Sequence, residues 1–199
     1  MPTALVTGGA IRLGRSVALH LAGRGYNIAL QYCSSRESAE QTAKEARNFD
    51  VQCKTYCADF TDFNSAPLLM GQVLADFNSM DLLVNSAANF IQKKIEETSN
   101  SELLDTININ LIAPFILMRE FKKKVNNGLI INILDERILR RVSTFGAYSV
   151  SKSALAHLTE LSAVSWGETV RVNGIAPGLI LPPAGSSGKY LLEKAPNIP

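Results

Sequence analysis

Short apolar runs alternate along the chain with longer stretches whose apolar residues recur at helical spacing. The short runs are rich in Val, Ile and Leu with little polar alternation, which is typical of strands covered on both faces. They predict strands at Ala4–Thr7, Asn27–Tyr32, Gln52–Cys57, Leu82–Asn85, Leu129–Leu134 and Val170–Ile175. The longer stretches predict helices near residues 12–23, 36–48, 65–77, 100–124 and 147–166.

This alternation of strands and helices predicts an α/β fold. We expect one Rossmann-type, doubly wound parallel sheet flanked by helices, forming a single dinucleotide-binding reductase domain over residues 1–199. A length of 199 residues fits one domain. Pro, Gly and Ser follow the last predicted strand, so residues 181–199 are expected to form an irregular region near the substrate, with a short helical stretch around Tyr190–Lys194.

Composition narrows the classes of partner. The chain is 46% hydrophobic with a formal net charge of +2, which gives no reason to expect nucleic acid or an anionic membrane. Residues Met1–Thr7 lack the basic flank and long apolar region of a signal peptide, and we expect no apolar run long enough to cross a membrane. An odd count of 3 cysteines, without paired metal-ligand spacing, indicates reduced thiols in a cytoplasmic protein with no metal site.

The first candidate chemistry is the pair Tyr148 and Lys152, four residues apart in a predicted helix. That spacing places both side chains on one helix face. An ordinary tyrosine titrates near pH ~10, and a neighbouring cation favours its phenolate, so the pair is a candidate general acid. The same spacing arises often by chance on exposed helices, where it is a surface tyrosine over a lysine stem. The other motifs therefore have to decide between the two interpretations.

A glycine-containing turn, Thr7-Gly8-Gly9-Ala10-Ile11-Arg12-Leu13-Gly14, joins the first predicted strand to the first predicted helix. Glycines let the backbone approach a pyrophosphate, and the helix N-terminus offers N–H groups and a positive dipole end. We therefore expect a dinucleotide cofactor at this turn, in preference to a simple tight strand-to-helix connection.

The end of the second predicted strand indicates which dinucleotide binds. NAD sites usually carry a carboxylate there for the ribose 2′-hydroxyl. In this chain the segment from Gln31 to Arg36 has none, and Arg12 can point to the same region. Because arginine binds phosphate in a bidentate manner, Ser34, Arg36 and Arg12 favour NADP(H). The alternative for Arg36 is a solvated residue that pairs with Glu40.

Together these motifs resemble the short-chain dehydrogenase/reductase family from Thr3 to about Leu181. The resemblance implies that Tyr148 and Lys152 are a catalytic pair and that Asn110 completes a proton relay. It also implies a contact with adenine from Asp59, cofactor binding at the motif that contains Asn85 and Ala87, and a turn beside the nicotinamide at Pro177 and Gly178. The full set of expected cofactor-binding residues is Thr7, Gly8, Arg12, Leu13, Gly14, Ser34, Arg36, Asp59, Asn85, Ala87, Tyr148, Lys152, Pro177 and Gly178.

Three departures from the family pattern resemble the pteridine reductases. Arg12 replaces the middle glycine of the turn, Asp135 replaces the catalytic serine, and Phe90 stands where many members have a smaller residue. In that subfamily the arginine and the aromatic residue flank the pterin. The resemblance implies catalysis by Asp135, Tyr148, Lys152 and Asn110, and substrate contacts from Arg12, Phe90, Asp135 and Tyr148.

Site chemistry favours the same subfamily. A carbonyl reductase needs a donor at the oxygen that becomes an alkoxide, whereas an ionised Asp135 repels that charge. A C=N nitrogen becomes basic as hydride arrives and tolerates a carboxylate, and Phe90 could supply a stacking face for a flat ring. The alternatives are that Phe90 is a core residue and that Asp135 pairs with Arg137 or Arg140.

The sequence therefore predicts NADPH-dependent reduction of a pteridine of the dihydrobiopterin, dihydromonapterin or dihydrofolate type. A carbonyl reductase, for example of 3-oxoacyl thioesters, and a non-catalytic NADP(H)-sensing protein are the alternatives. Family members usually continue with another helix and a seventh strand, which this sequence lacks. In the family that segment covers the substrate pocket and builds part of a tetramer interface. The resemblance as a whole implies a homo-oligomer, a tetramer.

Overall fold

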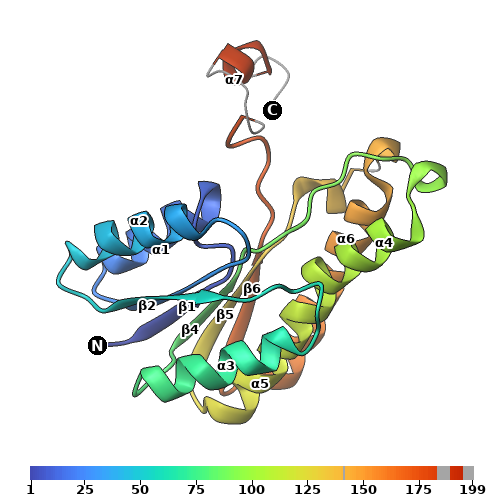
Figure 1. Ribbon diagram of the computed structural model, residues 1–199. Coiled ribbons are helices and arrows are strands. Elements are labelled where there is room, and N and C mark those ends of the chain that lie inside the picture. Colours follow the sequence, from blue (N-terminus) through green and yellow to red (C-terminus); the bar gives the residue numbers. More distant parts are fainter. Residues whose placement is uncertain (141, 183–188, 195–199) are drawn as a thin grey trace.

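A parallel sheet with helices on both faces makes up the computed structural model, which describes residues 1–140, 142–182 and 189–194 (Figure 1). The strands lie in the order β3-β2-β1-β4-β5-β6, and every neighbouring pair is parallel. The strands are β1 (Thr3–Val6), β2 (Asn27–Tyr32), β3 (Cys53–Cys57), β4 (Leu82–Asn85), β5 (Gly128–Ile133) and β6 (Val170–Ile175). The predicted α/β doubly wound sheet is confirmed, with bounds that shift by one residue in β1, β3 and β5.

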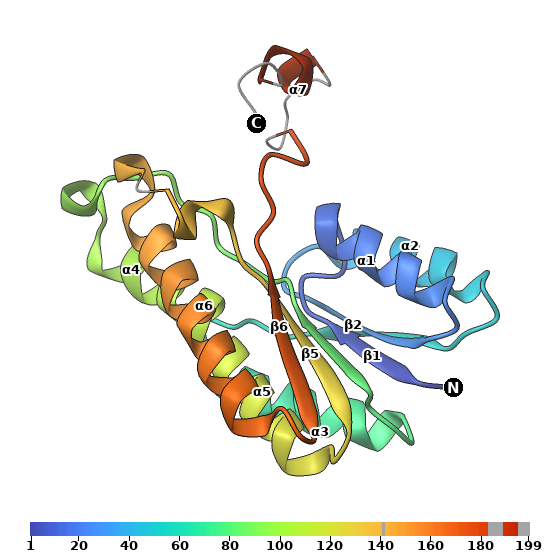
Figure 2. The same cartoon turned by 180° about the vertical axis from the view of Figure 1, so that it is seen from behind.

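Helices α1 to α6 form two layers that enclose the sheet, whereas α7 lies apart from it, beyond the end of β6 (Figures 1 and 2). They are α1 (Arg12–Ala22), α2 (Arg36–Arg47), α3 (Ser65–Asp76), α4 (Asn100–Ile107), α5 (Ala113–Lys124), α6 (Gly146–Trp166) and α7 (Lys189–Lys194). Small residues such as Ala18 and Ala43 let α1 and α2 approach one face closely, and they are fully buried. On the other face, Leu117 and Phe121 of α5 fill the space beneath α3 and α6. Burial of these apolar surfaces is the main force that holds the layers together.

The order of the strands reverses between β1 and β4. In open α/β sheets such a reversal opens a crevice outside the carboxyl ends of the strands, where ligands bind. Thr7 Oγ1 accepts hydrogen bonds from the backbone N–H groups of Ser86 (2.9 Å) and Ala87 (3.0 Å), which ties the two strand ends together. Gly8 has φ +63°, and a Cβ atom there would lie 2.9 Å from Ala87 Cα. Glycine is therefore required where the turn after β1 meets the end of β4.

A chain of buried amides fixes the register of the central strands. Asn85 and Asn132 are Cα partners in the β4–β5 pairing, and Asn85 Nδ2 donates to Asn132 Oδ1 at 2.8 Å. Asn132 Nδ2 donates in turn to Thr159 Oγ1 of α6 at 2.9 Å. A one-residue slip of β5 would turn Asn132 to the other face of the sheet and leave these buried groups unpaired.

The predicted helix over residues 100–124 is interrupted. A π-helical turn, Asn108–Ile112, separates α4 from α5. Pro114 follows at the start of α5, and a proline has no N–H group to donate to the carbonyl of Asn110, four residues earlier. The break in the regular hydrogen-bond ladder therefore falls beside Asn110, whose side chain is fully buried. Such π turns are frequent at functional sites.

The same helical stretch bears on the membrane prediction. Within the described residues, Asn100–Lys124 is long and apolar enough by length and composition to cross a membrane, so the expectation that no run is long enough was wrong on that criterion. Core helices of soluble proteins pass the same test, and 33% of the most apolar window is buried. Phe121 and Leu117 pack in the core of the sheet, which makes a membrane span a poor interpretation.

Replacement of Gly14 by alanine should destabilise the fold. A Cβ atom at Gly14 would collide with the carbonyl of Gly8, because α1 starts directly against the turn after β1. We expect Gly14→Ala to lower the free energy of unfolding in urea by about 1–3 kcal/mol, the usual cost of overpacking. Gly71 lies on the exposed side of α3 with nothing within 4 Å of a Cβ atom, so Gly71→Ala should stabilise by roughly 0.5–1 kcal/mol. Equal stabilisation at both positions would contradict the packing.

Candidate active site

The carboxylate of Asp135 lies at the centre of the site. Asp135 follows β5 and caps a short helix, Glu136–Ile138, where its Oδ1 atom accepts the backbone N–H of Arg137 at 2.8 Å. Arg137 Nη1 also donates to Oδ1 at 3.1 Å and to Oδ2 at 3.0 Å. Tyr148 Oη donates to Oδ2 at 2.9 Å. Asp135 is therefore the ion-pair partner of Arg137 and also a direct contact of Tyr148. The sequence offered these as alternatives, and both contacts are present.

Tyr148 and Lys152 lie on the buried face of α6. Their exposed fractions are 5% and 2%, which rules out the interpretation as a chance pair on an exposed helix. Lys152 Nζ donates to the backbone carbonyl of Ile133 at 2.7 Å and lies 5.9 Å from the centroid of the Tyr148 ring. The end of β5 therefore fixes the lysine near the Tyr148 ring.

Burial dominates the acid–base properties of this pair. Burial, with the charge and hydrogen bond of Asp135, raises the pKa of Tyr148 above its ordinary value, and Arg137 opposes that rise. Burial also lowers the pKa of Lys152 to about 8, and the Asp135 carboxylate opposes that fall. A neighbouring cation, Arg137, does act to lower the pKa of Tyr148, but burial and Asp135 outweigh it, so the expected net lowering by Lys152 is wrong for this arrangement. Tyr148 is a protonated phenol at neutral pH, which suits a proton donor.

Aromatic rings flank the phenol on the solvent side. Phe90 lies edge-on to Tyr148, with ring centroids 4.7 Å apart and an interplanar angle of 82°. Its exposed fraction is 54%, so Phe90 is not a core residue. Phe145, just before α6, has its ring centroid 5.0 Å from that of Phe90. The Arg137 guanidinium lies over both rings, 4.4 Å from the centroid of Phe145 and 5.5 Å from that of Phe90.

Asn110 holds the loop that carries Phe90. Its Oδ1 atom accepts the backbone N–H of Asn89 at 2.7 Å, and its Nδ2 atom donates to the carbonyl of Asn89 at 2.9 Å. Nδ2 also donates to Ser151 Oγ on α6 at 3.0 Å. The observed role of Asn110 is therefore to position the neighbour of Phe90 against the catalytic helix. The water relay that the family resemblance implies for Asn110 stays a prediction.

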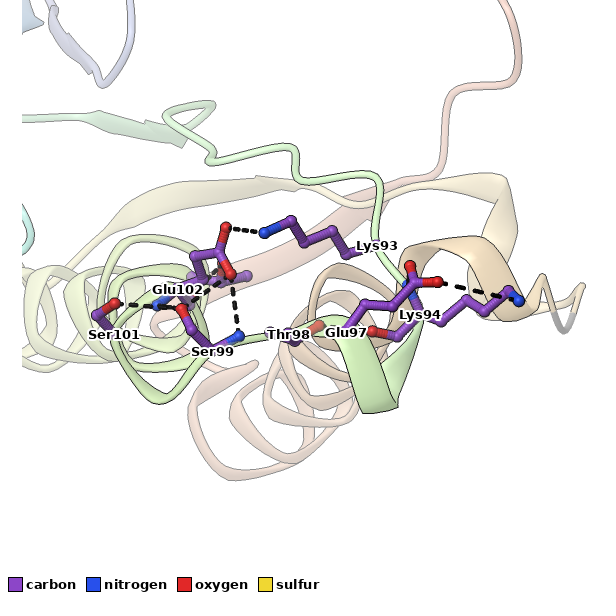
Figure 3. A network of polar contacts seen from close by, with 8 residues as sticks. Lys93, Lys94, Glu97, Thr98, Ser99, Ser101 and Glu102 are labelled. Atoms are coloured by element: carbon purple, nitrogen blue, oxygen red, sulfur yellow. Dashed lines mark hydrogen bonds and ion pairs between the residues drawn. The ribbon is translucent and has the colours of Figure 1, made fainter.

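A polar network anchors the far end of the same loop (Figure 3). Lys93 Nζ donates to Glu102 Oε1 at 2.6 Å, and Glu102 forms a capping box with Ser99 at the start of α4. Lys93, followed by Ser99, lowers the pKa of Glu102 to about 2. The loop between β4 and α4 is therefore fixed on both sides of Phe90, at Asn89 and at Lys93.

The glycine turn has the shape of a dinucleotide site. Because Gly14 lacks a Cβ atom, α1 begins directly against Gly8, and within the described residues no side chain caps its first turn at Ile11. Uncapped N–H groups at a helix start suit a pyrophosphate. The N–H group of Gly8 does not face the crevice, because it donates to Gln31 Oε1 at 2.8 Å. The N–H groups left to face a phosphate are therefore those at the start of α1, including Arg12 and Leu13, and their role in binding stays a prediction.

Arg12 has an unusual backbone. Its φ of +52° lies in the left-handed region, where residues other than glycine are uncommon. Its exposed side chain donates from Nη2 to the carbonyl of Pro182 at 2.8 Å, so it spans from the glycine turn to the segment after β6. A strained residue at a ligand-binding turn is typical of a functional position.

The remaining predicted cofactor residues lie along the same edge of the sheet, with one exception. Ser34 and Arg36 are exposed after β2, and Glu40 Oε1 accepts a hydrogen bond from Thr55. Asp59 Oδ1 accepts from the N–H and hydroxyl of Thr61, both at 2.9 Å. The exception is Asn85, whose side chain lies in the core at 2% exposure, so a contact at the end of β4 would come from the backbone around Ala87.

The turn after β6 closes the other side of the crevice. The carbonyl of Pro177 accepts the N–H of Glu136 at 3.1 Å, beside Asp135. A Cβ atom at Gly178 would meet the carboxylate of Glu136 at 3.7 Å, which is ordinary van der Waals contact. Residues 183–188 and 195–199 of the predicted irregular region lie outside the described residues, and the predicted short helix near Tyr190–Lys194 corresponds to α7.

Three residues of the site were not assigned by the sequence. Gln31 is 2% exposed and binds both Gly8 and the carbonyl of Ala58, and a glutamine inside an apolar strand was the available signal. Arg137 is named from the sequence only as an alternative ion-pair partner of Asp135, and its contact with the aromatic rings has no sequence signal. Phe145 had no signal beyond its place three residues before Tyr148.

The geometry suits transfer of a proton from a buried phenol to a bound substrate. Tyr148 can donate, whereas an ionised Asp135 can only accept hydrogen bonds. Lys152 supplies a positive charge within the same helix face, and the half-exposed ring of Phe90 offers a surface for a flat ligand. A nicotinamide dinucleotide along the crevice would lie between the start of α1 and the turn after β6.

Comparison with curated proteins places the chain among oxidoreductases. It is 31% identical over 184 residues to the uncharacterized oxidoreductase YhxC of Bacillus subtilis, covering 91% of the chain and 65% of the relative. It is 30% identical over 185 residues to the 3-oxoacyl-[acyl-carrier-protein] reductase FabG of Staphylococcus aureus, covering 90% of the chain and 74% of the relative. The chain therefore spans about two thirds to three quarters of the length of these relatives.

Solved structures and a family comparison agree with these relatives. NAD+-bound xylitol dehydrogenase superposes with a TM-score of 0.83 at 28% identity, covering 91% of this chain and 71% of the other. Acetoin dehydrogenase YohF from Salmonella typhimurium superposes with a TM-score of 0.85 at 26% identity, covering 94% and 76%. Residues 2–188 match the family described as short chain dehydrogenase. With its Tyr148–Lys152 pair buried beside the crevice of a doubly wound sheet, the chain belongs to the short-chain dehydrogenase/reductase family of oxidoreductases.

Proposed function

We propose that the protein reduces a C=N bond of a pteridine, such as dihydrobiopterin, dihydromonapterin or dihydrofolate, with NADPH as the hydride source. One observation carries the proposal. The phenol of Tyr148 donates at 2.9 Å to a carboxylate, Asp135, that also takes two hydrogen bonds from the Arg137 side chain. A hydrogen-bond acceptor therefore occupies the place where a carbonyl reductase needs a donor.

Electrostatics favours a nitrogen acceptor beside this carboxylate. Reduction of a carbonyl creates an alkoxide, and two unit charges of the same sign about 4 Å apart repel by about 4 kcal/mol at an effective dielectric constant of 20. A C=N nitrogen is more basic than a carbonyl oxygen, so it can take the proton from Tyr148 before or as the hydride arrives, and no full negative charge then develops beside Asp135. Asp135 can in addition accept a hydrogen bond from an N–H group of the ring.

The residues of the chain divide the remaining work. Tyr148 gives its proton to the ring nitrogen, and Lys152 stabilises the phenolate that remains. Phe90 offers its half-exposed ring to one face of the pteridine, and offset stacking of this kind contributes about 0.5–1.5 kcal/mol beyond area burial. A reduced nicotinamide bound at the crevice supplies the hydride.

The choice of NADPH rests on the region after β2. Ser34 and Arg36 are exposed there, and the segment from Gln31 to Arg36 contains no carboxylate to bind a ribose 2′-hydroxyl. One of the similar structures, xylitol dehydrogenase, has NAD+ bound, so both dinucleotides have to be compared.

We further propose that the protein is a homotetramer, on the grounds of the family resemblance. We propose a cytoplasmic location on the grounds of the free thiols of Cys33, Cys53 and Cys57.

Reduction of a 3-oxoacyl thioester is the second candidate. It is favoured by the 30% identity to the 3-oxoacyl-[acyl-carrier-protein] reductase FabG over 185 residues. The known relatives support this candidate better than pteridine reduction, whereas the chemistry of Asp135 and Phe90 supports the pteridine. The two candidates differ in whether the acceptor atom is oxygen or nitrogen.

A direct comparison of substrates should decide between the candidates. We expect cofactor oxidation at 340 nm to be faster with dihydrobiopterin or dihydrofolate than with acetoacetyl thioesters, and faster with NADPH than with NADH. Asp135→Ser should raise the carbonyl-to-pteridine ratio of kcat/KM, because it replaces an anion by a donor. Turnover of the thioester alone by the wild-type protein would overturn the pteridine proposal.

Replacement of the proton donor should separate catalysis from binding. Tyr148→Phe removes one oxygen atom from a buried ring, and we expect kcat to fall by about 10²–10⁴-fold, the usual contribution of a positioned general acid. NADPH affinity, measured by fluorescence titration, should stay nearly unchanged. Tyr26→Phe, before β2, is the matched control and should retain full activity. Turnover by Tyr148→Phe at the wild-type rate would contradict the role of Tyr148 as the proton donor.

The pH profile should report Lys152. Burial lowers the pKa of its ammonium group to about 8, so the positive charge is present below that pH and is lost as the pH rises through it. We expect kcat/KM, which reports the free enzyme, to be level at lower pH and to fall above pH ~8. Tyr148 stays protonated across this window because its pKa is raised. A kcat/KM that stayed level up to pH ~10 would exclude this role for the lysine charge.

A further inference from the structure

Arg137 occupies a place in the site that no motif assigns. Its guanidinium lies between the carboxylate of Asp135 and the rings of Phe90 and Phe145. The side chain is 26% exposed, and that of Asp135 is 13% exposed, so the pair is partly shielded from water. Partial burial makes such a pair worth more than a surface ion pair and makes removal of one partner costly.

The hydrogen bonds around Asp135 all run towards its two oxygens. Oδ1 accepts from the Arg137 N–H at 2.8 Å and from Nη1 at 3.1 Å, and Oδ2 accepts from Nη1 at 3.0 Å and from Tyr148 at 2.9 Å. An ionised carboxylate has about four acceptor sites, and donors fill all of them. In this arrangement Asp135 is the acceptor and Tyr148 the donor of the hydrogen bond that they share.

We propose that Arg137 is a positioning residue that keeps Asp135 an ionised acceptor and balances the negative charge that appears on Tyr148 when it donates its proton. Asp135 is then not a proton donor, and Tyr148 is the group that supplies the proton. The inference rests on the proposed function for the identity of the accepting atom. The charge argument itself applies to any acceptor that Tyr148 protonates.

The charge balance explains why the arginine is needed. When hydride reaches the carbon of C=N, the Tyr148 O–H bond breaks and an N–H bond forms, while the nicotinamide is oxidised and the substrate is reduced. The phenolate that remains lies beside the Asp135 carboxylate. The cluster consists of Tyr148, Asp135, Arg137 and Lys152. With both cations present, its net charge changes from positive to neutral when Tyr148 gives up its proton. Without Arg137 it passes from neutral to net negative in a buried setting, which slows proton release.

The two rings orient the guanidinium. A planar guanidinium can lie flat over an aromatic face while one of its nitrogens, here Nη1, donates to both oxygens of a carboxylate, whereas a lysine ammonium has no planar face. The centroid distances of 4.4 Å to Phe145 and 5.5 Å to Phe90 fit this arrangement. Because Phe90 also touches Tyr148, the arginine links the proposed substrate face to the proton donor.

The other charged groups near this cluster are few within the described chain. Lys152 approaches from α6, as noted above, and Glu136 lies beside Asp135 on the short helix. Arg140 Nε lies 3.9 Å from Glu136 Oε2, and Arg140 is exposed. Arg140 therefore pairs with a different carboxylate, and it provides a matched control on the same loop.

The test compares Arg137→Met and Arg137→Lys with the wild type from pH 6 to 9, at saturating NADPH and dihydropteridine. We expect Arg137→Met to lower kcat about tenfold at pH 8, since each pKa unit added to the donor corresponds to a factor of ten. The deficit should be smallest near pH 6, where Lys152 still carries the remaining positive charge, and should grow as the pH rises through about 8, where the lowered pKa of Lys152 removes that charge. Arg137→Lys keeps the positive charge but loses the planar guanidinium, so its kcat should lie between those of Arg137→Met and the wild type. The same variant tests the proposal if Arg137→Met fails to fold.

A second set of variants isolates the charge of Asp135. In an Asp135→Asn background, Arg137→Met should change kcat by less than about twofold, because Lys152 alone can balance the Tyr148 phenolate when no carboxylate lies beside it. Arg140→Met should leave the pH profile of kcat unchanged. A kcat deficit that is the same at every pH, and the same in both backgrounds, would overturn the proposal and leave Arg137 a purely structural role.

The outcome can be told apart from failure of the proposed function. If the wild type reduces only the acetoacetyl thioester, pteridine reduction fails, and the same pH series on that substrate still tests Arg137. Urea unfolding of the free protein gives a readout without substrate. The double-mutant cycle of Arg137→Met and Asp135→Asn should show a favourable coupling, and its absence would remove the ion pair on which the inference stands.

Discussion

The hydrogen bonds accepted by one carboxylate organise this site. Asp135 joins the end of β5, the short helix that follows it and the catalytic helix α6 through bonds of 2.8 to 3.1 Å. A partly buried carboxylate is costly unless its oxygens are paired, so the loop around Arg137 and the position of Tyr148 have to agree with it. The aromatic rings follow from the same requirement, because they hold the guanidinium that pairs with the carboxylate.

Much of the fold was accessible from the sequence because its signals are local. The run Asn27–Tyr32 matched β2 in both bounds, since a continuous apolar segment between turns has few other uses in a doubly wound sheet. The break between α4 and α5 was not foreseen. A proline such as Pro114 is common in the first turn of a helix, so by itself it does not indicate a π turn. The π turn accompanies contacts of Asn110 with Asn89 and Ser151, which are distant in sequence.

The site was partly predictable for a topological reason. Residues that follow parallel strands meet at one edge of the sheet, so Thr7, Ala87 and Asp135 could be placed together before any contact was known. The direction of the Tyr148 pKa shift could not be placed in this way. It depends on burial and on the balance of Asp135 against Arg137, which are properties of the folded arrangement. The buried position of the Asn85 side chain has the same origin, since its partner Asn132 lies on the neighbouring strand.

The π turn at Asn108–Ile112 also sets the rotational phase of the helix that follows it. Each residue of an α-helix advances the side-chain direction by about 100°, because a turn contains about 3.6 residues. One residue fewer in this turn would restore a regular helix and would rotate Leu117 and Phe121 away from the sheet. The irregular turn that positions Asn110 beside Asn89 therefore also determines that the apolar face of α5 is turned towards the core. Insertions and deletions in this segment should be tolerated far less well than substitutions.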